Sequence, residues 1–209
     1  MPLDLAELLA PASSAVLTME LQRGVVGDRA SIPDMAREVE ARGVLAAAAR
    51  LAEAARAAAV PVVHCTAEFR PDRAGSATNA PLLAVMAKRP DHLRVGSPEA
   101  QVVPELGPDP RDIVVPRLSG VSPFAGTALD VTLRHLGVRT VVATGVSVNL
   151  AVLGLAIEAV NLGYRVAVAT DAVAGTPAAY ADAVLDGTIA LLAARLTVDE
   201  IAAVWRAER

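Results

Sequence analysis

Residues 140–173 read TVVATGVSVNLAVLGLAIEAVNLGYRVAVATDAV, and this stretch determines the fold class. It begins with a β-branched run, turns at Gly145, continues with apolar residues at helical spacing to Gly163, and ends with a second β-branched run. We therefore expect a strand over 139–145, a helix over 147–164 and a strand over 165–173. Two strands joined by such a helix lie parallel in one sheet, with a right-handed crossover.

The same alternation of strand and helix extends outward from this stretch. Residues 14–21, 60–67 and 112–117 are predicted strands, and residues 35–59, 125–138 and 176–194 are predicted helices, with a short strand and helix in 195–205. The predicted fold class is α/β, with helices on both faces of a mostly parallel sheet in a three-layer arrangement.

Residues 69–111 have a different composition, rich in proline, glycine and charge, with one short helix predicted at 80–88. A loop-rich excursion of this length usually covers a site or an interface. With 209 residues, the chain is long enough for one substantial core. We expect residues 1–209 to form a single domain that includes this excursion.

Composition and charge narrow the class of partner. The formal net charge is −4 and no Lys/Arg run occurs, which argues against a nucleic-acid partner. No apolar run reaches membrane-spanning length, so no membrane partner is expected either. Apolar residues make up 54% of the chain, enough for a core enlarged by a subunit interface. We expect a small-molecule ligand and a homo-oligomer.

The single cysteine, Cys65, excludes an intrachain disulfide and fits a reducing compartment. The N-terminal residues lack the basic segment of a signal peptide, so a cytoplasmic location is expected. His64, His92 and His135 lack the paired spacing of metal ligands, and no glycine pattern for nucleotide binding follows any strand. Neither a metal nor a cofactor is predicted.

Ligands of such sheets bind beyond the carboxyl ends of the strands, where the strand order reverses. Glu20 and Arg117 each end an otherwise apolar strand. A carboxylate there is costly to bury unless it is paired, so a partly buried Glu20 facing Arg117 is the functional interpretation. The alternative is that Glu20 is an exposed residue at the rim of the sheet.

The candidate nucleophiles have structural explanations. Cys65 lies inside a predicted strand, where cysteines are usually inert packing residues. Ser147 stands between strand and helix, where serine is more often an N-cap, and no histidine is predicted beside it to act as a base. Ser122 or Thr127 is a candidate cap for the helix at 125–138. Phe124 is predicted either to line the pocket or to lie in the core.

The chain resembles the isochorismatase-like hydrolases, also called the cysteine hydrolase superfamily, over nearly its full length. The resemblance rests on AVLTMELQRGVVGD, PVVHCTAEFRPD, VVPRLSGVSPFAGTALDVTLRHLGV and the stretch at 140–173, in this order. It implies a six-stranded parallel sheet, assembly as a dimer or tetramer, and a cis peptide bond between Val146 and Ser147.

The resemblance also implies three departures from the amidase branch of the family, in which a thiol attacks the substrate, an aspartate takes its proton and a lysine supports both. The corresponding positions hold Ala151, Glu20 and Arg117. A methyl group offers neither a nucleophile nor a proton, so covalent catalysis is not expected. The isochorismatases proper also lack the cysteine, and there the resemblance implies protonation of a vinyl ether by the aspartate.

We therefore expect hydrolysis of a small polar or anionic metabolite without a cysteine nucleophile. Glu20 would be the general acid/base and Arg117 would orient the substrate, with Ala151 at the vacant nucleophile position. The further residues expected to bind substrate are Gln22, Phe124, Val146 and Ser147. The alternative is a non-catalytic ligand-binding protein or oligomeric pseudoenzyme that retains the fold. In that case Glu20 and Arg117 would close the former site with a bidentate pair.

Overall fold

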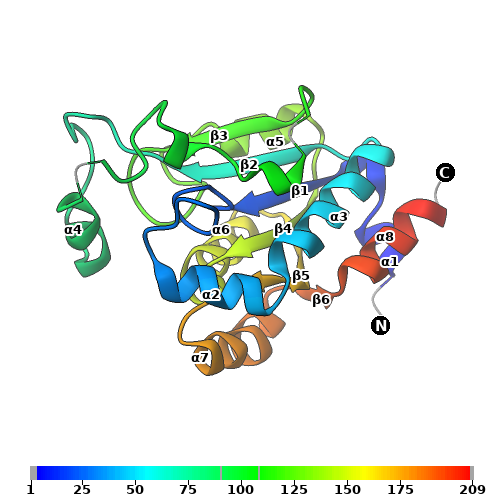
Figure 1. Cartoon of the computed structure of the whole chain (residues 1–209). Coiled ribbons are helices and arrows are strands. Elements are labelled where there is room, and N and C mark those ends of the chain that lie inside the picture. The colour runs from blue at the N-terminus through cyan, green and yellow to red at the C-terminus, as the bar shows by residue number, and fades with distance from the viewer. Residues whose placement is uncertain (1–3, 90, 108, 208–209) are drawn as a thin grey trace.

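The computed structural model describes residues 4–89, 91–107 and 109–207. Its centre is a six-stranded sheet of order β3-β2-β1-β4-β5-β6 in which every pair is parallel, as the sequence predicted (Figure 1). The strands are β1 (Ser14–Met19), β2 (Val62–Ala67), β3 (Ile113–Arg117), β4 (Thr140–Val146), β5 (Arg165–Ala174) and β6 (Ala194–Leu196). Every residue of β1, β2 and β4 is buried, because helices cover both faces of the sheet.

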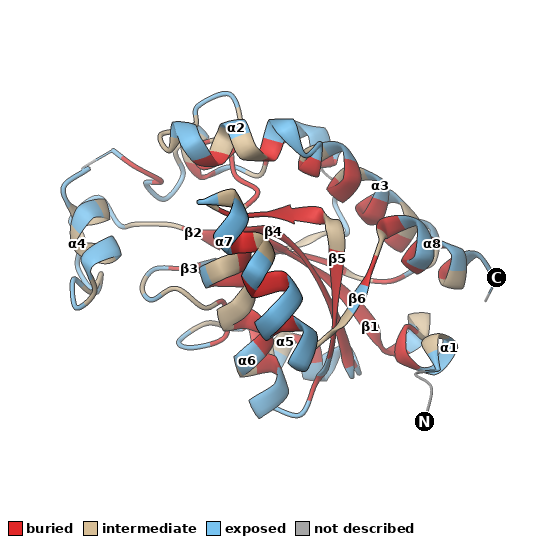
Figure 2. Cartoon of the chain, turned by 90° about the horizontal axis from the view of Figure 1, so that it is seen from below, coloured by how far each residue is buried: buried red, intermediate tan, exposed pale blue. Residues whose placement is uncertain are grey.

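Each face of the sheet has its own apolar cluster and its own helices (Figure 2). One face packs against α1 (Leu5–Leu8), α2 (Pro33–Ala41), α3 (Val44–Ala57) and α8 (Val198–Ala207). The other packs against α5 (Leu129–His135), α6 (Leu153–Asn161) and α7 (Ala178–Ala183). This is the expected three-layer α/β fold.

Shorter helical segments complete the described chain. The 3-10 turns are Pro11–Ser13, Pro98–Ala100, Pro104–Leu106 and Ile189–Leu191, and the π-helical turns are Val148–Val152 and Val184–Thr188. The excursion predicted at 69–111 contains the remaining helix, α4 (Pro81–Ala87), which projects from the body at the carboxyl ends of the strands (Figure 1). None of its residues is buried.

The helix predicted over 125–138 is shorter in the structure, where α5 is Leu129–His135, and three other predicted helices are divided. The helix predicted over 35–59 is two helices, because Gly43 adopts a left-handed conformation with φ of 64° and redirects the chain between α2 and α3. The helix predicted over 147–164 begins with a π-helical turn and becomes α-helical only at Leu153. The segment predicted as one helix at 176–194 divides into α7, a π-helical turn and a 3-10 turn.

In the described part of the chain, no helix combines the length and apolar character needed to cross a membrane.

Candidate active site

The site is built where β1 and β4 end side by side at the centre of the sheet. Met19 is the register partner of Gly145, and a Cβ at position 145 would lie 2.2 Å from the Met19 carbonyl oxygen. Glycine is therefore required for the two strands to approach this closely, and its φ of 104° also favours glycine. The peptide bond between Val146 and Ser147 is cis, as the resemblance implied.

Glu20 follows β1 directly in a left-handed conformation, with φ of 51°, so the strand ends at Met19, two residues before the predicted end at Leu21. Arg117 is the last residue of β3. Arg117 Nη2 donates a hydrogen bond of 2.5 Å to Glu20 Oε1, and Arg117 Nε donates one of 3.2 Å to the Gly120 carbonyl oxygen. The structure thus brings the two charged residues together through a single contact, not a bidentate pair.

The Arg117 guanidinium still has a free donor. Its side chain is 9% exposed, and Nη1 is buried with no hydrogen-bond partner among the described residues. A buried donor of a charged group without a partner is costly.

A cavity of about 280 Å³ lies beside this ion pair. Its polar lining comes from the sheet edge and the loops that follow the strands, including Glu20, Arg117, Ser119, Ser147, Asn149 and Thr176. Most other lining side chains are apolar, including Leu82, Leu83 and Met86 of α4 and Val25, Ile32 and Met35 near α2. The cavity therefore suits a small molecule with one polar or charged end and an apolar body.

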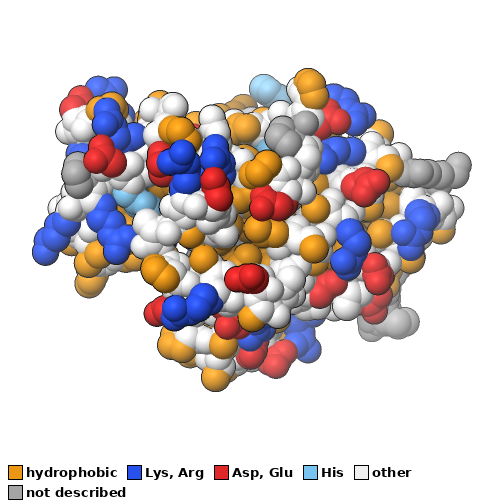
Figure 3. Space-filling model, in the orientation of Figure 1, with side chains coloured by type: hydrophobic (Ala, Val, Ile, Leu, Met, Phe, Trp, Pro, Cys, Tyr) orange, Lys and Arg blue, Asp and Glu red, His pale blue; other side chains and the backbone are white. Residues whose placement is uncertain are grey.

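Positive charge gathers around the α4 end of the molecule, where Figure 3 shows a concentration of Lys and Arg side chains. Residues 69–94 contain more basic than acidic side chains, although the whole chain carries a net charge of −4. The basic ones are Arg70, Arg73, Lys88, Arg89 and Arg94, and the acidic ones are Asp72 and Asp91. A local excess of positive charge near the cavity attracts anions.

Not all the predicted substrate-binding residues line this cavity. Val146 and Ser147 do line it, as does Ala151 at the position expected for the vacant nucleophile. Gln22 is fully buried instead, and its carboxamide binds the backbone at three points: Nε2 donates to the carbonyl oxygens of Ala67 and Ala100, and Oε1 accepts from the Ala67 N–H. The expectation that Gln22 contacts substrate is corrected to a structural role in tying the 100–102 segment to β2.

Phe124 also lies outside the cavity. Its side chain is 6% exposed, belongs to the apolar cluster beneath α5 and α6, and stacks on Tyr164 with ring centroids 5.9 Å apart. Of the two predictions for Phe124, the core position is the one found.

Cys65 has the inert environment that the sequence favoured, whereas the side-chain caps predicted for Ser147 and for Ser122 or Thr127 are not formed. Cys65 is 1% exposed and does not line the cavity, and burial raises the pKa of its thiol to about 12. Thr127 Oγ1 accepts a hydrogen bond from the Leu129 N–H, but the N-cap residue of α5 is Ala128, and Ser122 Oγ donates to Glu158. Ser147 occupies the N-cap position of the π-helical turn without a capping hydrogen bond from its side chain.

Four polar residues that line the cavity were not predicted as site residues: His92, Ser119, Asn149 and Thr176. His92 lines it from the loop after α4, and Asn149 lines it from the π-helical turn, where Nδ2 donates 3.3 Å to the Thr176 carbonyl oxygen. The sequence pointed to His92 only through the expectation that the 69–111 excursion covers a site. The described residues contain no group of three or more His, Cys, Asp or Glu arranged to hold a metal ion.

Comparisons with known proteins agree on one family. The isochorismatase domain matches residues 14–200. Ureidoacrylate amidohydrolase RutB of Pseudomonas syringae pv. syringae is 29% identical over 176 residues, covering 78% of this chain and 71% of that protein. The RutB protein of Agrobacterium fabrum is 30% identical over 170 residues, covering 75% of this chain and 73% of that protein.

Solved structures also include proteins with a similar fold. An isochorismatase family protein from Burkholderia thailandensis superposes with a TM-score of 0.75 and 28% sequence identity. The superposition covers 93% of this chain and 96% of that one.

Proposed function

We propose that this chain, which belongs to the isochorismatase family of hydrolases, hydrolyses a small polar or anionic metabolite without a cysteine nucleophile. The observation that carries the proposal is the Glu20–Arg117 pair at the cavity wall. One guanidinium nitrogen holds the carboxylate and the other, Nη1, is buried without a partner among the described residues. We propose that the Arg117 side chain shifts on binding, so that a substrate carboxylate or carbonyl oxygen in the cavity reaches Nη1 and supplies the missing acceptor.

Glu20 is proposed as the general acid/base. Its carboxylate takes a proton from a water molecule as the water oxygen bonds to the electrophilic carbon of the substrate. The same proton then passes to the leaving group as its bond to that carbon breaks. Arg117 holds the Glu20 carboxylate through Oε1, which leaves Oε2 for the water.

Ala151 supports a reaction without a covalent intermediate. It lines the cavity in the π-helical turn and presents only a methyl group, while the one cysteine of the chain lies in β2 outside the cavity. The turn still contributes polar groups, because the first N–H groups of a helix have no partner inside it. We propose that amides in the 146–151 segment hold an oxygen of the substrate as negative charge develops on it.

The size and lining of the cavity limit the substrate. With about 280 Å³ and mostly apolar walls, it suits a compact molecule with one anionic or carbonyl group at Arg117. Two relatives are named ureidoacrylate amidohydrolases, which makes small amides and ureido acids the first compounds to test. Enol ethers are the second class, because their hydrolysis needs an acid and a water molecule but no nucleophilic side chain.

The test is a turnover screen of these compounds with three proteins: wild type, Glu20→Gln and Cys65→Ala. Glu20→Gln keeps a similar shape but cannot carry the proton, so we expect turnover to fall by about 10²-fold to 10⁴-fold. Cys65→Ala removes the only thiol and is expected to keep turnover near wild type. Unchanged turnover in Glu20→Gln, or a substrate fragment found covalently attached by mass spectrometry, would contradict the proposal.

A ligand-binding protein that has lost hydrolysis is the second candidate. This second hypothesis predicts a bidentate Glu20–Arg117 pair with no cavity. In the structure, the pair has one contact and lies beside a cavity of about 280 Å³. The open cavity therefore favours an enzyme. Binding of a screened compound without turnover by the wild-type protein would favour the second candidate instead. A cytoplasmic location remains a prediction, which cell fractionation can check.

A further inference from the structure

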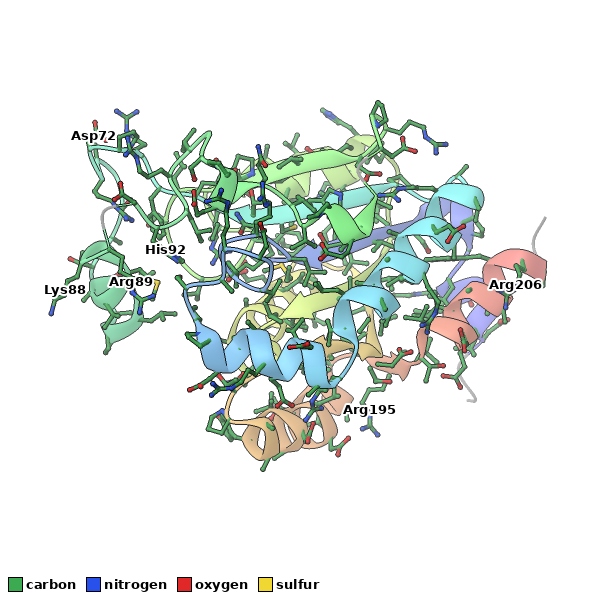
Figure 4. The ribbon with its side chains drawn as sticks, viewed as in Figure 1. Asp72, Lys88, Arg89, His92, Arg195 and Arg206 are labelled. Atoms are coloured by element: carbon green, nitrogen blue, oxygen red, sulfur yellow. The ribbon has the colours of Figure 1, made fainter. Side chains whose placement is uncertain are left out.

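His92 is a titratable cavity residue that the proposed reaction does not use. Its side chain lies between α4 and the carboxyl ends of the strands, near Arg89 (Figure 4). The residue is 8% exposed and lines the same cavity as Glu20 and Arg117. The backbone holds it in place, because the Leu93 carbonyl oxygen accepts from the Phe69 N–H at 2.8 Å and the Val95 N–H donates to the Phe69 carbonyl oxygen at 2.9 Å.

One nitrogen of the His92 ring is already engaged. Nδ1 lies 3.0 Å from Ser31 Oγ, and Ser31 Oγ is itself 3.4 Å from the Gly24 carbonyl oxygen. Ser31 does not line the cavity, so this hydrogen bond leads away from it. Nε2 has no hydrogen-bond partner among the described residues.

The geometry around Ser31 favours one tautomer of the His92 ring. A serine hydroxyl has one proton, and the Gly24 carbonyl oxygen can only accept. Both hydrogen bonds form only if Ser31 Oγ donates to Gly24 and accepts from a proton on His92 Nδ1. Nε2 of the neutral ring then carries a lone pair.

The surroundings keep the ring neutral. Burial, together with the positive charges of Arg89 and Arg73, lowers the His92 pKa to about 4. Arg89 is held close by donating from Nη1 to the Ser31 carbonyl oxygen at 2.8 Å. The Arg73 guanidinium carbon lies 4.2 Å from the centre of the Phe69 ring, which is also the aromatic neighbour of His92.

We infer that His92 Nε2 accepts a hydrogen bond from the bound ligand, and that the substrate therefore carries an N–H or O–H donor in addition to the acceptor group held by Arg117. This inference rests on the proposed function and makes the substrate class more specific. The ligand is a small anion or carbonyl compound with an apolar middle and a hydrogen-bond donor. A compound that lacks the donor leaves a buried acceptor unpaired and binds more weakly.

Matched pairs of probes test this inference by isothermal titration calorimetry. Succinamate, glutaramate and adipamate each carry a carboxylate and a terminal primary amide, and their controls are methyl ketones of the same length, in which a methyl group replaces the NH₂. In the wild-type protein, we expect the best-fitting amide to bind about tenfold more tightly than its ketone, which is the effect of one good hydrogen bond to a buried group.

Variants assign that preference to His92. His92→Leu is expected to reduce the preference to less than about twofold, whereas His92→Gln can place an amide oxygen near the position of Nε2 and is expected to keep most of it. If His92→Leu does not fold, Ser31→Ala serves as a second variant. Loss of the Ser31 hydroxyl lets the His92 proton move to Nε2, so the preference for the amide over the ketone is expected to weaken. Arg117→Gln should weaken both members of a pair about equally.

The outcomes separate this inference from the proposed function. An amide preference that is the same in wild type and His92→Leu overturns the inference, while Arg117-dependent binding still supports the proposed function. Failure of all the amides to bind to folded wild type also overturns it. Nitrogen-15 NMR of histidine-labelled protein gives a check without ligand: a proton on Nε2 in the folded protein contradicts the assigned tautomer.

Discussion

At the scale of single residues, Ala151 carries the proposal that hydrolysis proceeds without a covalent intermediate. It lines the cavity, whereas Cys65 is buried in β2 with a thiol pKa raised to about 12. We expect iodoacetamide to leave the wild-type protein unmodified, because the thiolate is the reactive form. The variant Ala151→Cys is expected to gain one adduct, detected by intact mass. An unmodified Ala151→Cys protein would show that small reagents do not reach this position.

His92 makes the stability of the fold depend on pH. Its pKa is about 4 in the folded protein, compared with 6.5 for an unperturbed histidine. Between these values the unfolded chain binds a proton that the folded chain does not, so the stabilisation is present above about pH 6.5 and is lost as the pH falls toward about 4. We expect His92→Gln to lose less stability than wild type in urea denaturation between about pH 7.5 and about pH 4.5. An identical loss in both proteins would contradict this expectation.

Sequence reasoning could identify Glu20 and Arg117 because each ends an apolar strand, and parallel strands end at the same edge of a sheet. The same reasoning failed for Gln22, since a polar residue just beyond a strand can turn inward to bind the backbone as well as outward to bind a ligand. It could not select His92, which lies in a loop whose path depends on contacts with Phe69 and Ser31. No periodic pattern encodes contacts of that kind.

At the scale of elements, the close approach of β1 and β4 determines the geometry of the site. Replacing Gly145 by alanine would place a Cβ 2.2 Å from the Met19 carbonyl oxygen, at a φ of 104°. We expect Gly145→Ala to reduce the free energy of unfolding by more than about 3 kcal/mol. Gly187→Ala is the matched control, since nothing lies within 4 Å of the added Cβ, and we expect a change within about 1 kcal/mol. Equal effects of the two substitutions in chemical denaturation would contradict this account.

A chain of buried polar groups joins β1, β2, α3 and the start of β3. Thr18 Oγ1 lies 2.8 Å from His64 Nδ1, and Asp112 Oδ2 lies 3.1 Å from His64 Nε2 and 2.6 Å from Arg56 Nη2. Burial lowers the His64 pKa, so its ring is neutral at neutral pH. Thr18 is 1% exposed in the core of the sheet, and we propose that these groups stabilise the fold.

Removing the charge of Asp112 tests that role. Its side chain is 6% exposed and pairs with Arg56, which is 14% exposed. We expect Asp112→Asn to reduce the free energy of unfolding by about 3–5 kcal/mol, because it leaves a largely buried guanidinium without its counter-charge. Asp91→Asn, in an exposed pair with Arg94, is the control and should unfold close to wild type in the same urea titration. A similar stability for all three proteins would show that the buried chain contributes little.

The order of strands and helices was predictable from the sequence, because the period of the apolar residues changes between strand and helix. The breaks inside the helices were less predictable. Gly43 lies in an otherwise helical pattern, and only its left-handed backbone shows that the chain changes direction there. The π-helical turn at Val148–Val152 has no distinctive composition, so a regular helix was expected in its place.

At the scale of the whole molecule, the helices on one face leave apolar side chains exposed. Val131 and Leu136 in and after α5, and Ile157, Val160 and Leu162 in and after α6, are each 38–50% exposed. We propose that this surface contributes to a homo-oligomer, a dimer or tetramer as the resemblance implied. Light scattering at micromolar concentration is expected to give a mass at least twice that of the 21.5 kDa chain. A monomeric mass would contradict the proposal.

The two apolar clusters share one continuous sheet, so we also propose that residues 1–209 form one cooperative unit. Near-ultraviolet and far-ultraviolet circular dichroism should then report the same thermal midpoint. Separate midpoints for the two signals would indicate that part of the chain unfolds independently.

The projecting helix α4 has a consequence for how such a protein can diversify. It supplies Leu82, Leu83 and Met86 to the cavity wall, yet none of its residues is buried, so few of the interactions that hold the fold together depend on its sequence. Substitutions there can reshape the entrance and the choice of ligand while the sheet and the charged pair stay intact. New substrate preferences can therefore evolve in this segment with little loss of foldability, and a mutational library confined to α4 is the natural starting point for engineering them.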